Sequence, residues 1–422
     1  MERTYLKRIS DEKLKLLLKA KGAVLIEGPK WCGKTSTAEE VANSVLYMQD
    51  PDTSQANILM AKTKPSILLE GEVPRLLDEW QVAPELWNAV RFAVDKRRSK
   101  GQFILTGSVI PTRTDDMHTG TGRIARMHMR TMSLFESGDS SGEISLESLF
   151  DKKLDINGKS KLTIENYAFL LNRGGWPSSA NENDERLALI VANDYLEAVI
   201  NEDISSADGV DKNPERVRSL ISSLSRHIST EARTATILND LKMNDESLSQ
   251  STVEQYIAAL KLIFVVEDLP AWSPKLRSKR AIRTTAKRHF VDPSIATSAL
   301  RATPKKLLAD FETFGLLFES LCIRDLRIYA DNIDGQVFHY RDKSGLEVDA
   351  IIQLADGRWG AVEVKLGAGM VEEAAENLLK FKKSIDVEKM GEPSFMMVLT
   401  GTEYAFCLEN EVLVVPLGCL RD

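Results

Sequence analysis

The hydrophobic and polar positions of the N-terminal third follow the pattern of alternating strands and helices. A short apolar run, Ala23 to Ile26, leads into a glycine-rich turn, and apolar residues at helical spacing follow at Ala38, Val41, Val45 and Leu46. This order indicates a buried strand, a loop and a helix. Two more short segments, Arg75 to Asp78 and Gln102 to Ser108, have apolar centres, end in polar residues and predict further strands. The pattern therefore predicts an α/β domain.

Helical spacing dominates the middle of the chain. Residues 160–205 predict helices around a pair of glycines, and three more helices follow between residues 214 and 262. The last is predicted to begin at Ser251, because Glu254 three residues later completes a capping box. Three helices followed by a strand-like run at 264–268 suggest a winged helix. Such a module either places its last helix in a DNA groove or serves for packing, and the near absence of basic residues in this helix favours packing.

Residues 345–367, GLEVDAIIQLADGRWGAVEVKLG, show the two-residue alternation of a β-hairpin. On the first strand the apolar residues share one face, which leaves Glu347 and Asp349 on the other. On the second strand Glu363 and Lys365 share a face in the same way. Each strand is thus half apolar and half charged.

The turn decides whether the two charged faces coincide. A two-residue loop would set Asp349 against a valine, whereas a three-residue loop with Gly357 in the left-handed conformation would set it against Glu363. We predict the second register, in which Lys365 lies opposite Glu347. Two carboxylates facing each other at about 5 Å repel unless a cation lies between them, and a divalent metal is the simplest candidate.

Composition limits the possible classes of protein without naming a function. The chain of 422 residues is 43% hydrophobic, which suffices for two or three domains with their own cores. The net charge of −7 gives no general affinity for nucleic acid, so any such surface must come from local clustering. The four cysteines are far apart and predict neither disulfides nor a zinc site. With no signal peptide and no apolar run of about 18 residues, we expect a soluble, cytoplasmic protein without a membrane segment.

The turn after the first strand has the sequence GPKWCGKT, a GxxxxGKT phosphate-binding loop between a strand and a helix. Its glycines let backbone N–H groups surround phosphate oxygens, Lys34 reaches the β- and γ-phosphates, and Thr35 is a ligand for Mg²⁺. The alternative is a chance glycine turn. The predicted residues that bind ATP are Gly28, Pro29, Lys30, Trp31, Cys32, Gly33, Lys34, Thr35 and Ser36.

The other two strands supply the remaining groups of an ATPase site. Asp78 is the expected second Mg²⁺ ligand beside Thr35, and Glu79 is placed to activate the attacking water. Thr106 and Ser108 are candidates for sensing the γ-phosphate, although hydroxyls at a strand end also serve simple turn chemistry.

Two further sets of basic residues have candidate roles. The spacing of Arg123, Arg126 and Arg130 predicts one helix face, and Arg123 or Arg126 is a candidate arginine finger, in cis or in a homo-oligomer. A solvated or salt-bridged face is the alternative. No acid occurs from Ser273 to His289, where a cluster of cations predicts contact with DNA phosphates, or else pairing with the protein's own carboxylates. The predicted DNA contacts are Lys275, Arg277, Lys279, Arg280, Arg283, Lys287 and Arg288.

The order of motifs resembles the AAA-type ATPases of bacteria and archaea that carry a C-terminal domain of unknown function. The resemblance covers nearly the whole chain. It includes GPKWCGKT, LLDEWQ, FILTGS, GRIARMHMRTMSLFES and RGGWP, then VVEDLPAWSPKLRSK, KRHFVDPS, ETFGLLFESLCIRDL, GLEVDAI and VEVKLG. It implies an N-terminal P-loop domain that binds ATP and a C-terminal domain similar to PD-(D/E)xK nucleases.

In those nucleases a helical Glu, an Asp and a Glu-x-Lys pair form the active site, and Glu319, Asp349, Glu363 and Lys365 match them. The resemblance thus implies that the three carboxylates bind Mg²⁺ or Mn²⁺ and that Lys365 orients or deprotonates the attacking water. In the alternative, Glu347 neutralises Lys365 in an inactive, scaffold-like domain.

The complete prediction is an α/β protein with three parts. Residues 1–205 form an AAA-like P-loop ATPase domain with a helical extension, 206–290 a winged-helix-like basic connector, and 291–422 a restriction-endonuclease-like α/β domain. The predicted function is ATP hydrolysis that controls a metal-dependent, DNA-interacting nuclease-like domain. The alternative is an ATP-switched regulatory or interaction protein whose nuclease-like domain is catalytically silent.

Overall fold

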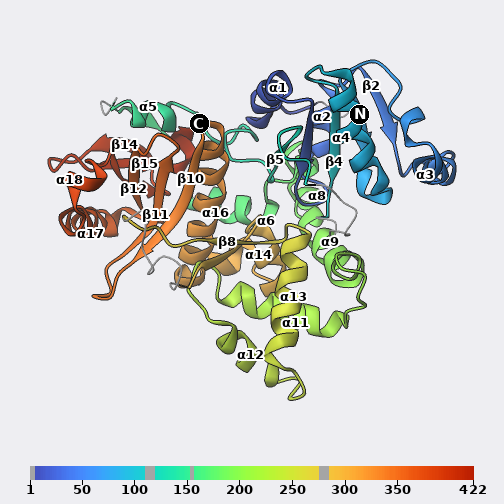
Figure 1. Ribbon diagram of the computed structural model, residues 1–422. Coiled ribbons are helices and arrows are strands. Elements are labelled where there is room, and N and C mark those ends of the chain that lie inside the picture. Colours follow the sequence, from blue (N-terminus) through green and yellow to red (C-terminus); the bar gives the residue numbers. More distant parts are fainter. Residues whose placement is uncertain (1–4, 110–118, 153–155, 275–284) are drawn as a thin grey trace. The chain divides into compact units, whose positions relative to one another are not determined.

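The computed structural model describes residues 5–109, 119–152, 156–274 and 285–422 (Figure 1). The chain forms two compact units, each assembled from separate segments. The N-terminal unit comprises Met1–Thr131, Glu202–Asp211 and Ala258–Val265. The C-terminal unit comprises Met132–Asn201, Lys212–Ile257 and Val266–Asp422. This division differs from the predicted boundaries at residues 205 and 290.

The N-terminal unit is built on a parallel sheet of five strands in the order β2-β3-β4-β1-β5. Because the strands run in one direction, their carboxyl ends meet at one edge, where ligands bind in open α/β sheets. The core contains Trp80 and Trp87, whose ring centroids lie 5.1 Å apart. The strands are β1 (Ala23–Glu27), β2 (Ser44–Tyr47), β3 (Arg75–Asp78), β4 (Phe103–Gly107) and β5 (Ile124–His128). The helices are α1 (Ser10–Ala20), α2 (Lys34–Glu39), α3 (Ser54–Thr63), η1 (Pro65–Ile67), η2 (Trp80–Val82) and α4 (Glu85–Arg97).

Two expectations for the N-terminal unit are wrong. The helix after the glycine-rich turn ends at Glu39, and Val45 and Leu46 belong to strand β2, because they pair with β3 in the sheet. Arg126 lies on strand β5 rather than on a helix, since β5 pairs in parallel with β1 at the sheet edge. In both cases pairing with a strand distant in sequence overrides local helical spacing.

The C-terminal unit begins with the predicted helical region, and the helices expected in 160–205 are present. The helix that was predicted to begin at Ser251 begins at Gln250, because the Ser249 hydroxyl accepts a hydrogen bond from Thr252 N at 3.1 Å. It is followed by β8 (Val266–Leu269) and β9 (Lys287–Phe290), which pair antiparallel. The helices of this part of the chain are α5 (Leu146–Phe150), α6 (Ile164–Arg173), α7 (Pro177–Ala180), α8 (Glu185–Ala188), α9 (Ile190–Ala198), a π-helix (Val199–Asp203), α10 (Ile204–Ser206), α11 (Pro214–Arg226), α12 (Thr234–Lys242), α13 (Gln250–Leu262), α14 (Ser294–Leu300) and α15 (Pro304–Leu307). Of these, α10 belongs to the N-terminal unit, and the π-helix and α13 are each divided between the two units.

The last third of the chain supplies six strands of a seven-stranded mixed sheet in the order β10-β11-β12-β13-β15-β14-β7. Helices α16 (Phe311–Asn332) and α17 (Val371–Ser384) both pack against β11 and β12 (Figure 1). The sheet strands are β7 (Gly158–Lys159), β10 (Gly335–Arg341), β11 (Glu347–Leu354), β12 (Trp359–Lys365), β13 (Met396–Thr400), β14 (Tyr404–Cys407) and β15 (Leu413–Pro416). The smaller elements are β6 (Ile144–Ser145), which pairs with β16 (Leu420–Arg421), and the helices η4 (Ala368–Met370), α18 (Val387–Met390) and η5 (Leu417–Cys419).

The predicted hairpin register is confirmed. Ala350 pairs with Val362 and Gln353 with Trp359, so the next position of the ladder sets Asp349 against Glu363. The loop has three residues, and Gly357 has a φ of 93°, a conformation that favours glycine. Among the helices of the described residues, none is both long and apolar enough to cross a membrane.

Candidate functional site

The glycine-rich loop connects the carboxyl end of β1 to the start of α2. Lys34 is 5% exposed, and its Nζ donates hydrogen bonds to the carbonyls of Gly28 at 3.0 Å and Pro29 at 2.7 Å. The amine therefore lies inside the loop, where phosphates would be surrounded. Gly28 is required by space, because an added Cβ would lie 2.0 Å from the carbonyl oxygen of Met129. Gly33 is required by conformation, because its φ is 98°.

Asp78 meets the loop at the end of β3. Its Oδ1 accepts hydrogen bonds from the hydroxyls of Thr35 at 2.6 Å and Thr106 at 2.7 Å. Thr106 is fully buried on β4, the strand between β1 and β3. The structure thus brings the two predicted Mg²⁺ ligands, Thr35 and Asp78, into contact, and a hydroxyl and a carboxylate are donors that Mg²⁺ accepts.

Glu79 follows Asp78 in the left-handed conformation, with a φ of 54°. Its backbone N donates to the Thr106 hydroxyl at 3.1 Å, and its carboxylate accepts from Ser108 at 3.3 Å and from Gln81. A left-handed backbone is uncommon for a residue other than glycine, and here it accompanies the contact of this carboxylate with Ser108, the residue that follows β4. Both predicted sensors therefore contact the acidic pair.

The two arginine-finger candidates make ion pairs within the N-terminal unit. Arg123 Nε lies 2.9 Å from Asp95, and Arg126 Nη1 lies 2.8 Å from Glu27 at the end of β1. Arg126 also lies over the ring of Trp87, 5.6 Å from its centroid. These contacts agree with the salt-bridged alternative, and a finger role for either arginine stays a prediction.

Two other contacts to the phosphate loop were not predicted. Arg8 is 4% exposed and donates to the carbonyls of Cys32 at 2.7 Å and Arg130 at 2.9 Å, so it fixes the back of the loop. Lys30 forms an ion pair with Asp203 at 2.5 Å. Neither contact has a local sequence signal, because each joins residues more than 20 positions apart.

Most of the predicted DNA contacts, from Lys275 to Arg283, lie outside the described residues. The other two do not present free cations to a phosphate backbone. Lys287 is 6% exposed and pairs with carboxylates, and Arg288 donates to the carbonyl of Ala232 at 2.7 Å. The structure therefore contradicts a DNA contact by Lys287, because its ammonium is buried inside the fold.

The predicted nuclease-like residues do lie together in the C-terminal unit, and Lys287 joins them. Lys287 Nζ is 2.9 Å from Glu319 on α16 and 3.6 Å from Asp349 on β11. Lys365 Nζ is 3.1 Å from Glu363 and 3.9 Å from Asp349. Lys365 pairs with Glu363, whereas Glu347 pairs with Arg341 at 2.7 Å. The alternative in which Glu347 neutralises Lys365 is therefore wrong in its choice of partner.

Burial and mutual repulsion shift the pKa values in this cluster. Burial, and after it the charge of Asp349, raises the pKa of Glu319 to about 7 and that of Glu363 to about 8. Burial opposes the charge of Lys287, but the carboxylates of Glu319 and Asp349 outweigh it and raise the pKa of this ammonium. Lys287 therefore remains charged at neutral pH.

The cluster does not fit a divalent metal. Its carboxylate oxygens already face two ammonium groups, and within the described ranges no three or more His, Cys, Asp or Glu side chains are grouped so that they could hold a metal ion. The predicted metal ligands Glu319, Asp349 and Glu363 are thus neighbours, but the positive charges that face them are the ammonium groups of Lys287 and Lys365.

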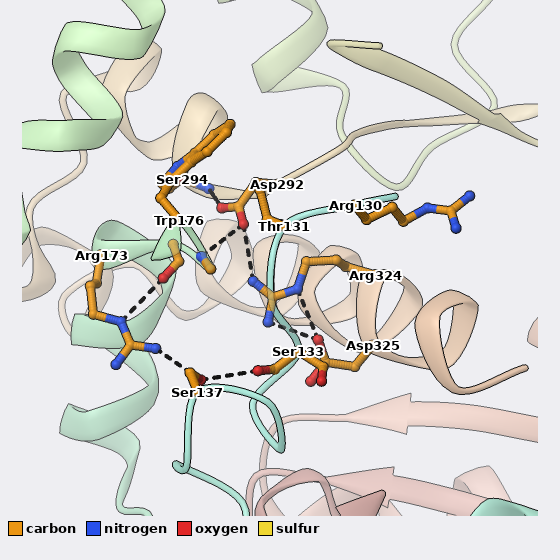
Figure 2. A network of polar contacts seen from close by, with 12 residues as sticks. Arg130, Thr131, Ser133, Ser137, Arg173, Trp176, Asp292, Ser294, Arg324 and Asp325 are labelled. Carbon is orange, nitrogen blue, oxygen red and sulfur yellow. Dashed lines mark hydrogen bonds and ion pairs between the residues drawn. The ribbon is translucent and has the colours of Figure 1, made fainter. Parts of the chain in front are cut away.

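A second polar network of the C-terminal unit links four of the quoted motifs (Figure 2). Arg324 and Asp325, side by side on α16, are buried, and Arg324 lies 3.1 Å from Asp292 and 2.7 Å from Asp325. Asp292 accepts from Gly175 N, and Asp325 accepts from Leu134 N, each at 2.9 Å. Buried acids that are satisfied in this way fix the segments around 134, 175 and 292 to helix α16.

The glycines of the RGGWP motif are set by this network. Gly174 has a φ of 72°, and an added Cβ there would lie 2.5 Å from Ser294 Oγ. At Gly175 an added Cβ would lie 2.1 Å from the carbonyl oxygen of Met132. Both positions therefore exclude a larger side chain.

Comparison with known protein families divides the chain into three parts. Residues 20–137 match the AAA domain family, residues 164–306 match a domain of unknown function, DUF8612, and residues 314–420 match another, DUF4143. No curated protein matches the sequence. The family match and the loop geometry agree that the N-terminal region is a P-loop ATPase-like domain, which supports ATP binding and ATPase activity.

Several solved structures share some similarity with the chain. A Walker-type ATPase of Pyrococcus abyssi is 15% identical, with 70% of this chain and 96% of that chain covered and a TM-score of 0.46. AMPPCP-bound DnaA from Aquifex aeolicus is 17% identical, with 60% and 86% covered and a TM-score of 0.29. A signal transduction ATPase with a tetratricopeptide repeat sensor, from Pyrococcus horikoshii, is 15% identical, with 78% and 50% covered and a TM-score of 0.25.

Proposed function

We propose that this protein is an ATP-hydrolysing switch whose nucleotide state controls its C-terminal unit. The observation that carries the proposal is the contact of Thr35 with Asp78 beside the buried amine of Lys34. Thr35 and Asp78 would hold Mg²⁺, which neutralises charge on the phosphates, and Lys34 would bind the β- and γ-phosphates. Glu79, held by Ser108 and Gln81, would orient and deprotonate the attacking water.

Two substitutions test the ATPase part. Lys34→Ala should abolish ATP binding, measured by titration with a fluorescent ATP analogue, because the loop loses its cation. Glu79→Gln should still bind ATP but hydrolyse it at least about tenfold more slowly, because only the water-activating group is lost. Glu40→Gln, at an exposed position of the same segment, is the matched control. Unchanged hydrolysis in both site variants would refute the assignment.

For the C-terminal unit we propose binding to a partner rather than cleavage by a bound metal. The support is the carboxylate cluster, whose charges are met by Lys287 and Lys365. This favours the silent scaffold over the metal-dependent nuclease. Plasmid, single-stranded and branched DNA incubated with Mg²⁺ or Mn²⁺, with and without ATP, should remain uncut. Cleavage that Asp349→Asn abolishes would instead establish the nuclease.

DNA is the proposed partner, and the support is the run of cations from Lys275 to Arg283 in the sequence. Neutralising Arg280 and Arg283 together should weaken DNA binding and reduce its salt dependence by about one unit of slope per lost contact. Lys305→Ala, a cation on the short helix α15, is the control. Equal affinity and equal slope would show that Arg280 and Arg283 make no phosphate contact, and would favour pairing of these cations with the protein's own carboxylates.

A further inference from the structure

The carboxylate cluster of the C-terminal unit is assembled from four elements that are far apart in sequence. Lys287 begins β9, Glu319 lies on α16, Asp349 on β11, and Glu363 and Lys365 on β12. Three of these side chains, Lys287, Glu319 and Glu363, expose 13% or less of their surface. The cluster is therefore a built feature of the interior rather than a chance contact of surface residues.

The charges of the cluster balance as they would around a divalent ion. When all three are ionised, Glu319, Asp349 and Glu363 contribute three negative charges, against the two positive charges of Lys287 and Lys365. The raised pKa values of Glu319 and Glu363 reduce this negative charge at neutral pH. One Mg²⁺ or Mn²⁺ would supply the same two positive charges. A divalent ion in addition to both lysines would leave an excess of positive charge in a buried site, which is costly.

Both oxygens of Asp349 and of Glu363 already have partners within the protein. Asp349 Oδ1 faces Lys287, while its Oδ2 accepts from Val364 N at 2.9 Å. Glu363 Oε2 accepts from Lys365, and its Oε1 accepts from Asn377 on α17 at 2.8 Å. Lys287 bridges two carboxylates that both lie on elements other than its own, Glu319 on α16 at 2.9 Å and Asp349 on β11 at 3.6 Å. Lys365, in contrast, bonds mainly to Glu363 of its own strand.

We propose that Lys287 is a built-in cation, whose ammonium lies between Glu319 and Asp349 and excludes a divalent metal from this site. The backbone holds it there, because β9 pairs with β8 along its whole length and sets Lys287 opposite Leu269. The inference concerns the C-terminal unit alone, so its failure would leave the proposed ATPase function standing. It predicts that removal of Lys287 converts the cluster into a metal site.

The test is a titration of the full-length chain with Mn²⁺, followed by electron paramagnetic resonance without nucleotide. Every protein carries Asp78→Asn, so that the N-terminal carboxylate does not contribute. With Lys287 present, no specific Mn²⁺ binding is expected. Lys287→Met, similar in length and uncharged, should bind one Mn²⁺ per chain, at least about tenfold more tightly than the charge-preserving control Lys287→Arg. Adding Asp349→Asn to Lys287→Met should abolish this binding.

The opposite results overturn the proposal. If the chain that retains Lys287 binds Mn²⁺ and loses this binding with Asp349→Asn, the lysine does not exclude the metal. A folded Lys287→Met chain without Mn²⁺ binding would show that the lysine does not occupy a metal position. If Lys287→Met does not fold, the test uses the melting temperature of the chain that retains Lys287, measured with and without Mn²⁺. If Mn²⁺ raises this melting temperature and Asp349→Asn removes the rise, the proposal is refuted. If Mn²⁺ leaves the melting temperature unchanged while Asp349→Asn lowers it, the proposal is supported.

Discussion

Two aspartates on buried strands of this chain are held in opposite ways. Asp78 accepts hydrogen bonds from the hydroxyls of Thr35 and Thr106, whereas Asp349 faces the ammonium groups of Lys287 and Lys365. Hydroxyls orient a carboxylate without supplying a positive charge, which suits Asp78 to the predicted role of a Mg²⁺ ligand. Ammonium groups orient a carboxylate and cancel its charge. The hydrogen-bond and ion-pair partners of an aspartate, more than its position on a strand, therefore determine whether its carboxylate can bind a metal ion.

The largest expected effect separates the two aspartates directly. Asp78→Asn should lower Mg²⁺-dependent ATP hydrolysis by at least about 100-fold, measured as phosphate release, because a metal ligand is lost. Asp349→Asn should instead lower the free energy of unfolding by about 3 kcal/mol, measured with denaturant, because two lysines lose a shared partner. A more stable Asp349→Asn chain would mean that repulsion between carboxylates, and not lysine pairing, dominates this cluster.

The pairing of Lys287 with Glu319 can be measured by a double-mutant cycle. Lys287→Met and Glu319→Gln should each destabilise the protein, and the double variant should be about 2 kcal/mol more stable than the sum of the two losses predicts. The matched cycle uses Arg341 and Glu347, an exposed pair at 2.7 Å, which should couple by less than about 1 kcal/mol. Equal coupling in the two cycles would contradict the special role of the buried pair.

Removal of one hydroxyl from Asp78 should have a moderate effect. Thr106→Val keeps the shape of the buried side chain and should slow ATP hydrolysis about tenfold, because Asp78 and the backbone of Glu79 lose a shared partner. Steady-state kinetics would show a lower kcat with little change in KM. Thr121→Val, at an exposed position, provides the control. A rate equal to that of the control would show that the hydroxyl of Thr35 alone orients Asp78.

The smallest effect is expected at Arg126, which is charged but partly exposed. Arg126→Gln breaks the ion pair with Glu27 and should change the free energy of unfolding by less than about 0.5 kcal/mol. ATP hydrolysis should fall by no more than about twofold if this arginine only pairs with Glu27. A loss of about 1,000-fold in kcat would establish Arg126 as the arginine finger.

Local patterns predicted the parts of the fold that depend on neighbours in sequence. The glycine-rich loop, the strand that ends in Asp78 and the register of the hairpin all follow from spacing within about 25 residues, and the structure contains all three. Gly357 is a good example, because a three-residue turn requires one residue with positive φ. The confirmed register then placed Asp349 against Glu363.

The sequence could not show partners that tertiary packing supplies. Lys287 looked like a DNA contact because it ends a run of cations, but Glu319 and Asp349, which bury it, lie 32 and 62 positions away. Arg8 supports the phosphate loop, although it lies 24 positions before Cys32 in the sequence. The helix predicted through Leu46 stops early because β3 offers Val45 and Leu46 a strand partner. In each case a distant residue changes the meaning of a local signal.

The support of the phosphate loop by Arg8 has a mechanical consequence. Arg8 binds the carbonyls of Cys32 in the loop and of Arg130 and Thr131 in the segment after β5. The next residue, Met132, donates its N–H to the carbonyl of Gly175 at 2.6 Å, within the network that fixes helix α16. The carbonyl of Thr131 and the N–H of Met132 belong to one peptide group, which is therefore hydrogen-bonded at both of its polar atoms. This peptide group cannot rotate without breaking one of these hydrogen bonds.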